Sequence, residues 1–152
     1  MTGERNRLKL VDVSPDDASY RLQDQIGFIL RKAHQRHVAI FASHIADLTP
    51  PQFAALAKLA DVGETSQNQL GVLVAMDAAT IKGVIDRLKA RGYVSLSQNE
   101  QDKRRLMVDL TGEGRAAIAA LIPLARAITD ETLAPLNDRE QQQFAKLLAK
   151  IA

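Results

Sequence analysis

The sequence predicts a mainly α-helical fold that carries one β-hairpin. Along most of the 152 residues, apolar side chains recur at steps of three and four, which is the spacing of amphipathic helices. Val94, Leu96, Leu106 and Val108 instead alternate with polar residues, and this alternation indicates two paired strands. A third observation is a series of strong helix starts, because residues with side-chain oxygens stand immediately before several apolar runs.

Length and composition restrict the class of protein. At 16.6 kDa the chain fits one ordinary domain, and 46% hydrophobic with 25% charged residues excludes both a disordered segment and a membrane protein. Met1–Lys9 has no apolar stretch behind its charges, so we expect no signal peptide and a cytoplasmic protein. The chain contains no cysteine, which excludes disulfides, thiol nucleophiles, cysteine zinc sites and thiol-oxidation switches.

The N-terminal part predicts an arm followed by a long helix. Residues 1–18 are polar and of mixed charge, and we interpret them as an arm in front of a single domain of residues 19–152. No proline interrupts the chain from Tyr20 to about Asp47, where the apolar spacing predicts one amphipathic helix. At 1.5 Å per residue this helix is about 40 Å long, so it overhangs a domain of this size and is expected to pack on a second subunit.

Two more helices are predicted at the C-terminal end. Thr111 is the expected N-cap of a helix rich in alanine and leucine that runs to about Leu133. Pro123 lies inside this helix, and because proline removes a backbone hydrogen bond, we expect a kink or break just before it. Asn137 is the expected N-cap of the last helix, with Glu140 placed to complete a capping box.

Residues 49–111 contain a second group of helices followed by the hairpin. Thr49 before Pro50 is a strong helix start. A short helix then opens at Ser66, and after a tight link Asp77 caps a further helix. Two short helices joined in this way and followed by a hairpin make a winged helix-turn-helix lobe.

The winged helix-turn-helix has a direct physical use. Its second helix fits the major groove of DNA, and arginine on the hairpin (the wing) reaches the narrower, more negative minor groove. Seven basic and four acidic residues lie from Asp77 to Arg105, a net charge of +3, whereas the rest of the chain carries −1. A basic segment on a mildly acidic body is typical of a nucleic-acid binder.

The expected DNA contacts lie on three elements: the short helix, the outer faces of the second helix, and the wing. Ile81, Val84, Ile85 and Leu88 are expected to face the core, which leaves small and basic residues outside. The expected contacts are Ser66, Gln67, Ala78, Ala79, Thr80, Lys82, Gly83, Arg87, Lys103, Arg104 and Arg105.

Four motifs in this order resemble the MarR family of bacterial winged-helix transcriptional regulators. They are Leu48-Thr49-Pro50-Pro51-Gln52-Phe53, Gln69-Leu70-Gly71, Thr80 to Leu88 with its exit Lys89-Ala90-Arg91-Gly92-Tyr93-Val94, and Asp102-Lys103-Arg104-Arg105 followed by Val108-Asp109-Leu110-Thr111-Gly112-Glu113-Gly114. The flanking helices extend the resemblance to Tyr20–Ala152. Gly83 departs from the family pattern and costs about 1 kcal/mol relative to alanine. It either permits close approach of the backbone to DNA or weakens the assignment of neighbouring base contacts.

The resemblance implies an obligate homodimer that binds a pseudo-palindromic DNA operator. Residues 19–48 and 112–152 would then form the dimerisation helices. Carried over residue by residue, the resemblance places Arg104 at the wing tip in the minor groove and pairs Asp102 with Arg87, which orients the wing. The sequence has no nucleophile elbow, phosphate-binding glycine loop or metal-ligand pattern in register, so we expect neither an enzyme nor a cofactor.

Three histidines of the first helix fall on one stripe, and three interpretations of them stay open. They hold a metal ion, they are hydrogen-bonded within a helix interface, or they line a small-molecule pocket beside the DNA-binding lobe, where regulators of this kind bind an effector. Arg36 and Lys32 would add positive charge for an anionic ligand. The expected pocket residues are His34, Arg36, His37, Phe41, His44 and Phe53.

These features predict a dimeric, ligand-responsive repressor whose two recognition helices lie about 34 Å apart on DNA. From the resemblance, the expected effector is a small aromatic anion, such as an aromatic carboxylate, or its CoA thioester, and no membrane partner is expected. The alternative is a winged-helix adaptor that binds another protein and never touches DNA. A duplex affinity that falls steeply with salt separates the two.

Overall fold

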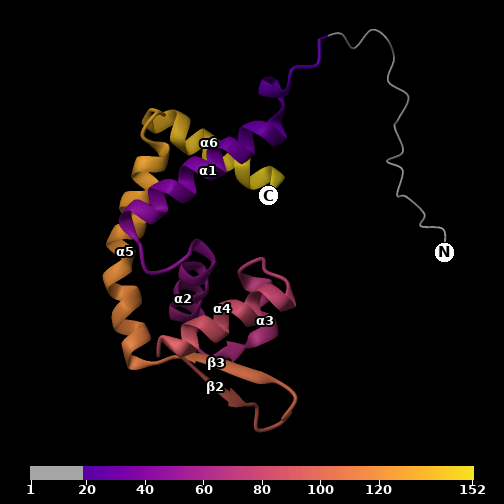
Figure 1. Cartoon of the computed structure of the whole chain (residues 1–152), viewed down its shortest axis with the longest axis vertical. Helices are drawn as coiled ribbons and strands as arrows, with labels where there is room; N and C mark the ends of the chain where they lie inside the picture. Colours follow the sequence, from indigo (N-terminus) through magenta and orange to yellow (C-terminus); the bar gives the residue numbers. More distant parts are fainter. Residues whose placement is uncertain (1–18) are drawn as a thin grey trace, which may run out of the picture. The chain divides into compact units, whose positions relative to one another are not determined.

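The computed structural model describes residues 19–152 (Figure 1). The expected N-terminal arm, residues 1–18, lies outside the described residues. Contacts divide the chain into two units, Met1–His34 and Gln35–Ala152. The described residues form a mainly helical fold with a small antiparallel sheet, which confirms the predicted fold class.

In the first unit a short 3₁₀ turn precedes the first long helix. The turn, η1, spans Leu22–Asp24, and helix α1 spans Ile26–His44, so its C-terminal part belongs to the second unit. Gln25 between them has an extended backbone, with φ −81° and ψ 135°, and this interrupts the single helix predicted from Tyr20. The predicted helix was also too long at its other end, because α1 stops before Asp47 and the chain turns there to bury two apolar residues, Ile45 and Leu48.

The next three helices begin at the capping residues that the sequence predicts. They are α2 (Pro50–Val62), α3 (Gln67–Leu73) and α4 (Ala78–Ala90). Thr49, Ser66 and Asp77 each accept a hydrogen bond from the backbone N–H three residues later. Each cap therefore satisfies one of the donors that a helix start leaves without an internal partner.

A tight turn sets α3 against α4. Ala75 in this turn has a φ of 56°, in the left-handed region that residues with a side chain rarely adopt. In α3, a Cβ added to Gly71 would lie 3.1 Å from the Met76 carbonyl oxygen and 3.2 Å from Cγ2 of Ile81. The missing side chain of Gly71 thus allows the close packing of the two helices.

The sheet has three strands, one more than the predicted hairpin. β1 (Thr65–Ser66), β2 (Val94–Gln98) and β3 (Leu106–Leu110) are antiparallel in the order β1-β3-β2. The hairpin of β2 and β3 confirms the prediction, and it places Leu96 opposite Val108. The two-residue β1 was missed because two positions are too few to show an alternating pattern.

The core of the second unit lies where α2, α3 and α4 meet the sheet. Its largest fully buried side chains come from all four of these parts: Leu56, Leu59, Leu70, Ile81, Ile85, Leu88 and Val108. The four α4 residues that were predicted to face the core are all buried. Burial of one face fixes the opposite face of α4 toward solvent.

Helix α5 spans Gly112–Leu133 without interruption, so of the kink or break expected just before Pro123, the break does not occur. Figure 1 draws α5 as one continuous, bowed ribbon. Pro123 is exposed, as is Ala119, whose carbonyl loses its hydrogen-bond donor to the proline. Water can hydrate that carbonyl, and the helix curves without ending.

Helix α6 spans Asp138–Ile151 and begins with the predicted capping box. Asn137 accepts a hydrogen bond from the backbone N–H of Glu140, and the Glu140 side chain accepts one from the N–H of Asn137. None of the residues of α6 is buried. Within residues 19–152, no helix is both long and apolar enough to span a membrane.

The start of α5 packs tightly against the end of α4 and the start of β2. A Cβ added to Gly114 would lie 2.0 Å from the carbonyl oxygen of Tyr93, so glycine is required there. The Thr111 hydroxyl donates to the carbonyl of Gly92 at 2.6 Å, and its backbone N–H donates to the carbonyl of Tyr93 at 3.0 Å. These contacts join α5 to the root of the hairpin.

Candidate nucleic-acid interface and ligand pocket

The outward face of α4 carries the residues that the sequence predicts to contact DNA. The following α4 positions are exposed: Ala78, Ala79, Thr80, Lys82, Gly83 and Arg87. Lys82 pairs with Asp86 at 2.8 Å, which holds its ammonium group beside the outer face. This face combines small side chains with two cations and Asp86, and a helix with such a face can enter the major groove.

The start of α4 is fixed by Asp77. Its carboxylate lies 2.7 Å from the backbone nitrogen of Thr80. Hydrogen bonds from the Thr80 backbone N–H and hydroxyl lower the pKa of Asp77, because they stabilise its charged form. Thr80 is therefore placed at the outward corner of the first helical turn.

The wing tip between β2 and β3 is an ordered turn. The Asn99 side chain accepts hydrogen bonds from the backbone N–H groups of Gln101 and Asp102. Asp102 in turn accepts from the backbone N–H of Arg104 at 3.1 Å and from its Nε at 3.4 Å. The Arg104 side chain is 93% exposed, and Lys103 beside it is also exposed. The cations of the tip thus project into solvent on a fixed backbone.

The predicted pair between Asp102 and Arg87 is not formed. The Asp102 carboxylate is occupied by Arg104 of the same turn, which is nearer in sequence and needs no movement of the wing toward α4. Arg87 forms no ion pair with any residue from 19 to 152. Its guanidinium remains available on the outer face of α4.

Two of the expected contacts, Ser66 and Gln67, are not exposed. Ser66 is only 5% exposed, and its hydroxyl caps α3 and lies 3.5 Å from Nη2 of Arg105. Gln67 is half-buried. We therefore leave Ser66 out of the proposed DNA contacts and regard Arg105 as a link between the wing and α3.

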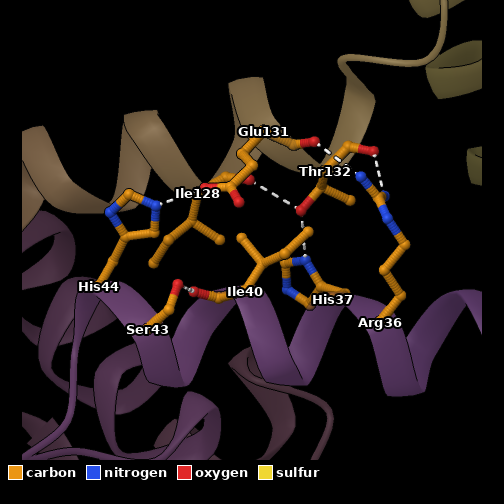
Figure 2. A network of polar contacts seen from close by, with 8 residues as sticks. All are labelled: Arg36, His37, Ile40, Ser43, His44, Ile128, Glu131 and Thr132. Carbon is orange, nitrogen blue, oxygen red and sulfur yellow. Dashed lines mark hydrogen bonds and ion pairs between the residues drawn. The ribbon is translucent and has the colours of Figure 1, made fainter.

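A polar network joins the C-terminal part of α1 to the last turn of α5 (Figure 2). Arg36 donates to the carbonyls of Thr132 and Glu131 at 2.7 and 3.0 Å, which satisfies acceptors that the helix end leaves open. His37 Nδ1 lies 2.9 Å from the Thr132 hydroxyl, and His44 Nε2 lies 2.6 Å from a Glu131 carboxylate oxygen. Sequence reasoning missed Glu131 and Thr132, although the open carbonyls of a predicted helix end were an available signal.

Three of the six expected pocket residues line one cavity. The cavity has a volume of about 230 Å³ and is lined by His37, Phe41, Pro50, Phe53, Ala125, Ile128 and Thr129. The rings of Phe41 and Phe53 meet edge to face, with centroids 6.1 Å apart. The walls thus come from α1, α2 and α5, and we call this cavity the ring pocket.

The other expected pocket residues lie elsewhere. Arg36 caps the end of α5, and His34 is exposed and belongs to the first unit. His44 lines a separate cavity of about 260 Å³ that also contains Arg91 and Tyr93. No group of three metal-ligating side chains occurs among the residues that the structure describes, and His37 and His44 have the hydrogen-bond partners of an interface between helices.

An exposed helix beside an ordered basic wing defines a DNA-binding regulator, and comparisons identify its family. The sequence model of the MarR family matches residues 48–106. The transcriptional repressor NicR of Pseudomonas putida is 43% identical over 138 residues, 90% of this chain and 87% of NicR. The regulator HosA of Escherichia coli is 34% identical over 122 residues, 80% of this chain and 90% of HosA.

Comparison with solved structures leads to proteins of the same kind. A probable transcriptional regulator from Pseudomonas aeruginosa superposes with a TM-score of 0.85 and 52% identity, over 87% of this chain and all of that one. BpsR of Bordetella bronchiseptica, whose DNA binding is regulated by 6-hydroxynicotinic acid, has a TM-score of 0.83 and 41% identity over 87% and 96% of the two chains. The repressor CouR bound to a 23-mer DNA duplex has a TM-score of 0.80 and 26% identity over 86% and 94%.

The chain therefore belongs to the MarR family of transcriptional regulators. It is a winged-helix transcriptional repressor, and proteins of this family bind DNA and are not enzymes.

Proposed function

We propose that this repressor binds a pseudo-palindromic operator as a homodimer and releases it when a one-ring aromatic carboxylate enters the ring pocket. The proposal rests on the observation that helices inside and outside the DNA-binding lobe both line the ring pocket. Phe53 belongs to α2 of the DNA-binding lobe, whereas Phe41 and Ile128 belong to the helices outside it. A ligand between them touches both parts at once.

The DNA contacts that we propose come from α4 and the wing. Thr80, Lys82 and Arg87 would face base edges and phosphates in the major groove, flanked by the small residues of the same face. Arg104 and Lys103 would reach the adjacent minor groove from the wing tip. The likeness to CouR, whose structure contains a duplex, supports this arrangement.

The size of the ring pocket favours a free acid over a CoA thioester. At about 230 Å³ it is smaller than the roughly 300–1,000 Å³ of pockets that hold drug-sized ligands. Its two phenylalanine rings suit an aromatic ligand, because aromatic pairs prefer the edge-to-face and offset arrangements that such walls offer. The relation to BpsR, which responds to 6-hydroxynicotinic acid, supports the same ligand class.

His37 supplies a polar end to this otherwise apolar pocket. The Thr132 hydroxyl donates to the carbonyl of Ile128 at 2.7 Å, so its oxygen accepts the hydrogen bond from His37 Nδ1. Nε2 is then left to meet the ligand. It accepts from a ring hydroxyl when the imidazole is neutral and donates to a carboxylate when it is protonated.

A second copy of the chain would cover the apolar residues that α5 and α6 leave exposed. They are Ile122, Leu124, Phe144, Leu147, Leu148 and Ile151. In α6 the apolar residues recur at helical spacing while none is buried, which is the pattern of a helix that lacks its partner. The described part of the first unit likewise exposes apolar residues along η1 and α1: Leu22, Ile26, Ile29 and Leu30.

Release follows if the ligand binds one arrangement of the dimer more tightly than the other. The two recognition helices must lie about 34 Å apart to reach successive major grooves. A ligand that binds more tightly to a dimer with a different separation lowers the affinity of the dimer for DNA. The largest possible decrease equals the ratio of the ligand's affinities for the two arrangements of the dimer.

The test begins with a selection of bound duplexes from random DNA, followed by fluorescence anisotropy on the selected operator. We expect affinity to fall by orders of magnitude between 50 and 200 mM salt, as it does for proteins that contact about six to ten phosphates. If the affinity for the duplex does not change with salt, or if the selection yields no bound sequence, the result would instead support the protein–protein adaptor.

The effector is tested on the same operator with 6-hydroxynicotinic acid and with benzoic acid. We expect either acid to weaken operator binding of the wild type. Ala125→Leu, which fills the ring pocket, is expected to keep operator binding and lose the response. Ala116→Leu, an exposed position on the same helix away from the pocket, is the matched control. An unaltered response of Ala125→Leu would exclude the ring pocket as the effector site.

A further inference from the structure

Gly83 lies in the middle of α4, on the face opposite the core. A Cβ added to Gly83 would meet no atom within 4 Å, so nothing in this chain excludes a side chain there. Glycine in the middle of a helix is destabilising relative to alanine. The fold therefore bears the cost of a mid-helix glycine without any internal packing that would require it.

Other glycines of the same lobe have an internal reason. A Cβ at Gly71 would press on Met76 and Ile81 of the helix-turn-helix, and Gly92 has a φ of 78° that favours glycine. Gly83 shares neither property. The chain itself gives no reason for glycine at position 83, whereas a partner that approaches the helix backbone would give one.

The outward face on which Gly83 lies favours DNA as that partner. At 100° per residue, Gly83 lies within about 40° of Ala79 and of Arg87. Lys82, held by Asp86, borders the same face. Cationic side chains thus flank a point where the helix backbone has no side chain in front of it.

We propose that Gly83 is a specificity-determining residue, at which the backbone of α4 lies directly against base edges at the floor of the major groove. This inference rests on the proposed mode of DNA binding. A side chain at position 83 would stand between the backbone and the bases, so the helix would have to withdraw. The flanking contacts of Thr80 and Arg87 would then lengthen together.

The test is the substitution Gly83→Ala, measured for both stability and operator binding. Alanine is the better helix former, so we expect the melting temperature to rise by about 2–4 °C. On the operator selected with the wild type, we expect affinity to fall at least tenfold. Opposite signs for stability and binding are the signature of a close approach, because a disrupted helix would lower both.

The matched control is Gly27→Ala, compared at protein concentrations at which both proteins are dimers, because Gly27 adjoins the exposed apolar residues of α1 that we propose a second copy covers. Gly27 also lies in a helix, α1, and a Cβ there would likewise meet nothing within 4 Å. Its operator affinity is expected to match that of the wild type, without a loss of stability. The duplex selection is then repeated with Gly83→Ala. We expect a changed base preference at the base pairs of each half-site that face position 83, and an unchanged preference at the flanking base pairs that the wing contacts.

Two outcomes separate failure of this inference from failure of the proposed function. If the wild type selects an operator and Gly83→Ala binds it equally well, the close approach is wrong while the DNA-binding proposal stands. If the wild type binds no duplex, the proposed function fails and this inference fails with it. A Gly83→Ala protein that loses both stability and affinity would also overturn the inference.

Discussion

His37 Nδ1 lies 2.9 Å from the Thr132 hydroxyl, and this contact between α1 and the last turn of α5 involves a residue that also lines the ring pocket. The two residues are 95 positions apart in the sequence. The same imidazole therefore stabilises the packing of two helices and faces the proposed effector.

Replacing Thr132 tests the structural half of this role. Thr132→Val keeps the shape of the side chain but leaves the part-buried Nδ1 of His37 without its partner. We expect a loss of about 1–3 kcal/mol in the free energy of unfolding, measured by urea denaturation at fixed protein concentration. Thr129→Val, one turn earlier and exposed, is the control, and an equal loss in both variants would contradict the importance of the contact.

Arg104 is expected to contribute to DNA binding and not to stability. Its side chain is almost fully exposed, so Arg104→Ala should leave the melting temperature within about 1 °C of the wild type. Operator affinity should fall at least tenfold, as expected for an arginine lost from a narrow minor groove. Lys146→Ala removes an exposed cation of α6 and serves as the control. Unchanged affinity of the Arg104 variant would exclude its place in the minor groove.

The cap of α4 makes stability depend on pH at the acidic end. Because the folded pKa of Asp77 is lowered below 3.8, the charged cap stabilises the fold above that pH, and this contribution is lost as the pH falls through the folded pKa. We expect Asp77→Ala to melt below the wild type at pH 7, and the difference to shrink as the pH falls through the folded pKa of Asp77.

Asp77→Asn separates the charge from the cap. Asparagine also caps helices well, so the variant should keep most of the stability at pH 7 but show a flatter acid dependence. Thermal melts followed by circular dichroism from pH 2 to pH 7 measure both effects. A constant difference between the wild type and Asp77→Ala at every pH would show that the charge is unimportant.

The exposed apolar stripe of α6 predicts how the dimer can be broken. Leu147→Glu places a charge in the surface that we propose a second copy covers, and analytical ultracentrifugation should show a monomer. Lys146→Glu changes the charge of the neighbouring exposed position and should remain a dimer. If the Leu147 variant stays dimeric, the interface lies elsewhere.

Local chemistry explains which parts of the fold could be predicted from the sequence. Thr49, Asp77 and Asn137 cap helices through their own side chains, so residue type and position suffice to place the helix starts. The hairpin was equally readable, because alternation extends over both of its strands. Extended backbone at Gln25 and the two-residue β1 leave no such pattern.

The site was less predictable than the fold, because its contacts join distant segments. Whether Asp102 pairs with Arg87 or with Arg104 depends on where the wing stands, which spacing does not determine. The stripe of three histidines was visible in the sequence, yet only His37 lines the ring pocket. Glu131 and Thr132, which hold the side chains of Arg36, His37 and His44, come from a helix end almost 100 residues away.

The close fit of Gly114 against Tyr93 has a mechanical consequence. With no space for even one carbon atom between them, the first turn of α5 and the root of the wing cannot slide past each other. The first turn of α5 and the root of the wing would therefore move as one rigid unit. A small ligand that shifts the C-terminal end of α5 would rotate the winged helix-turn-helix lobe with it.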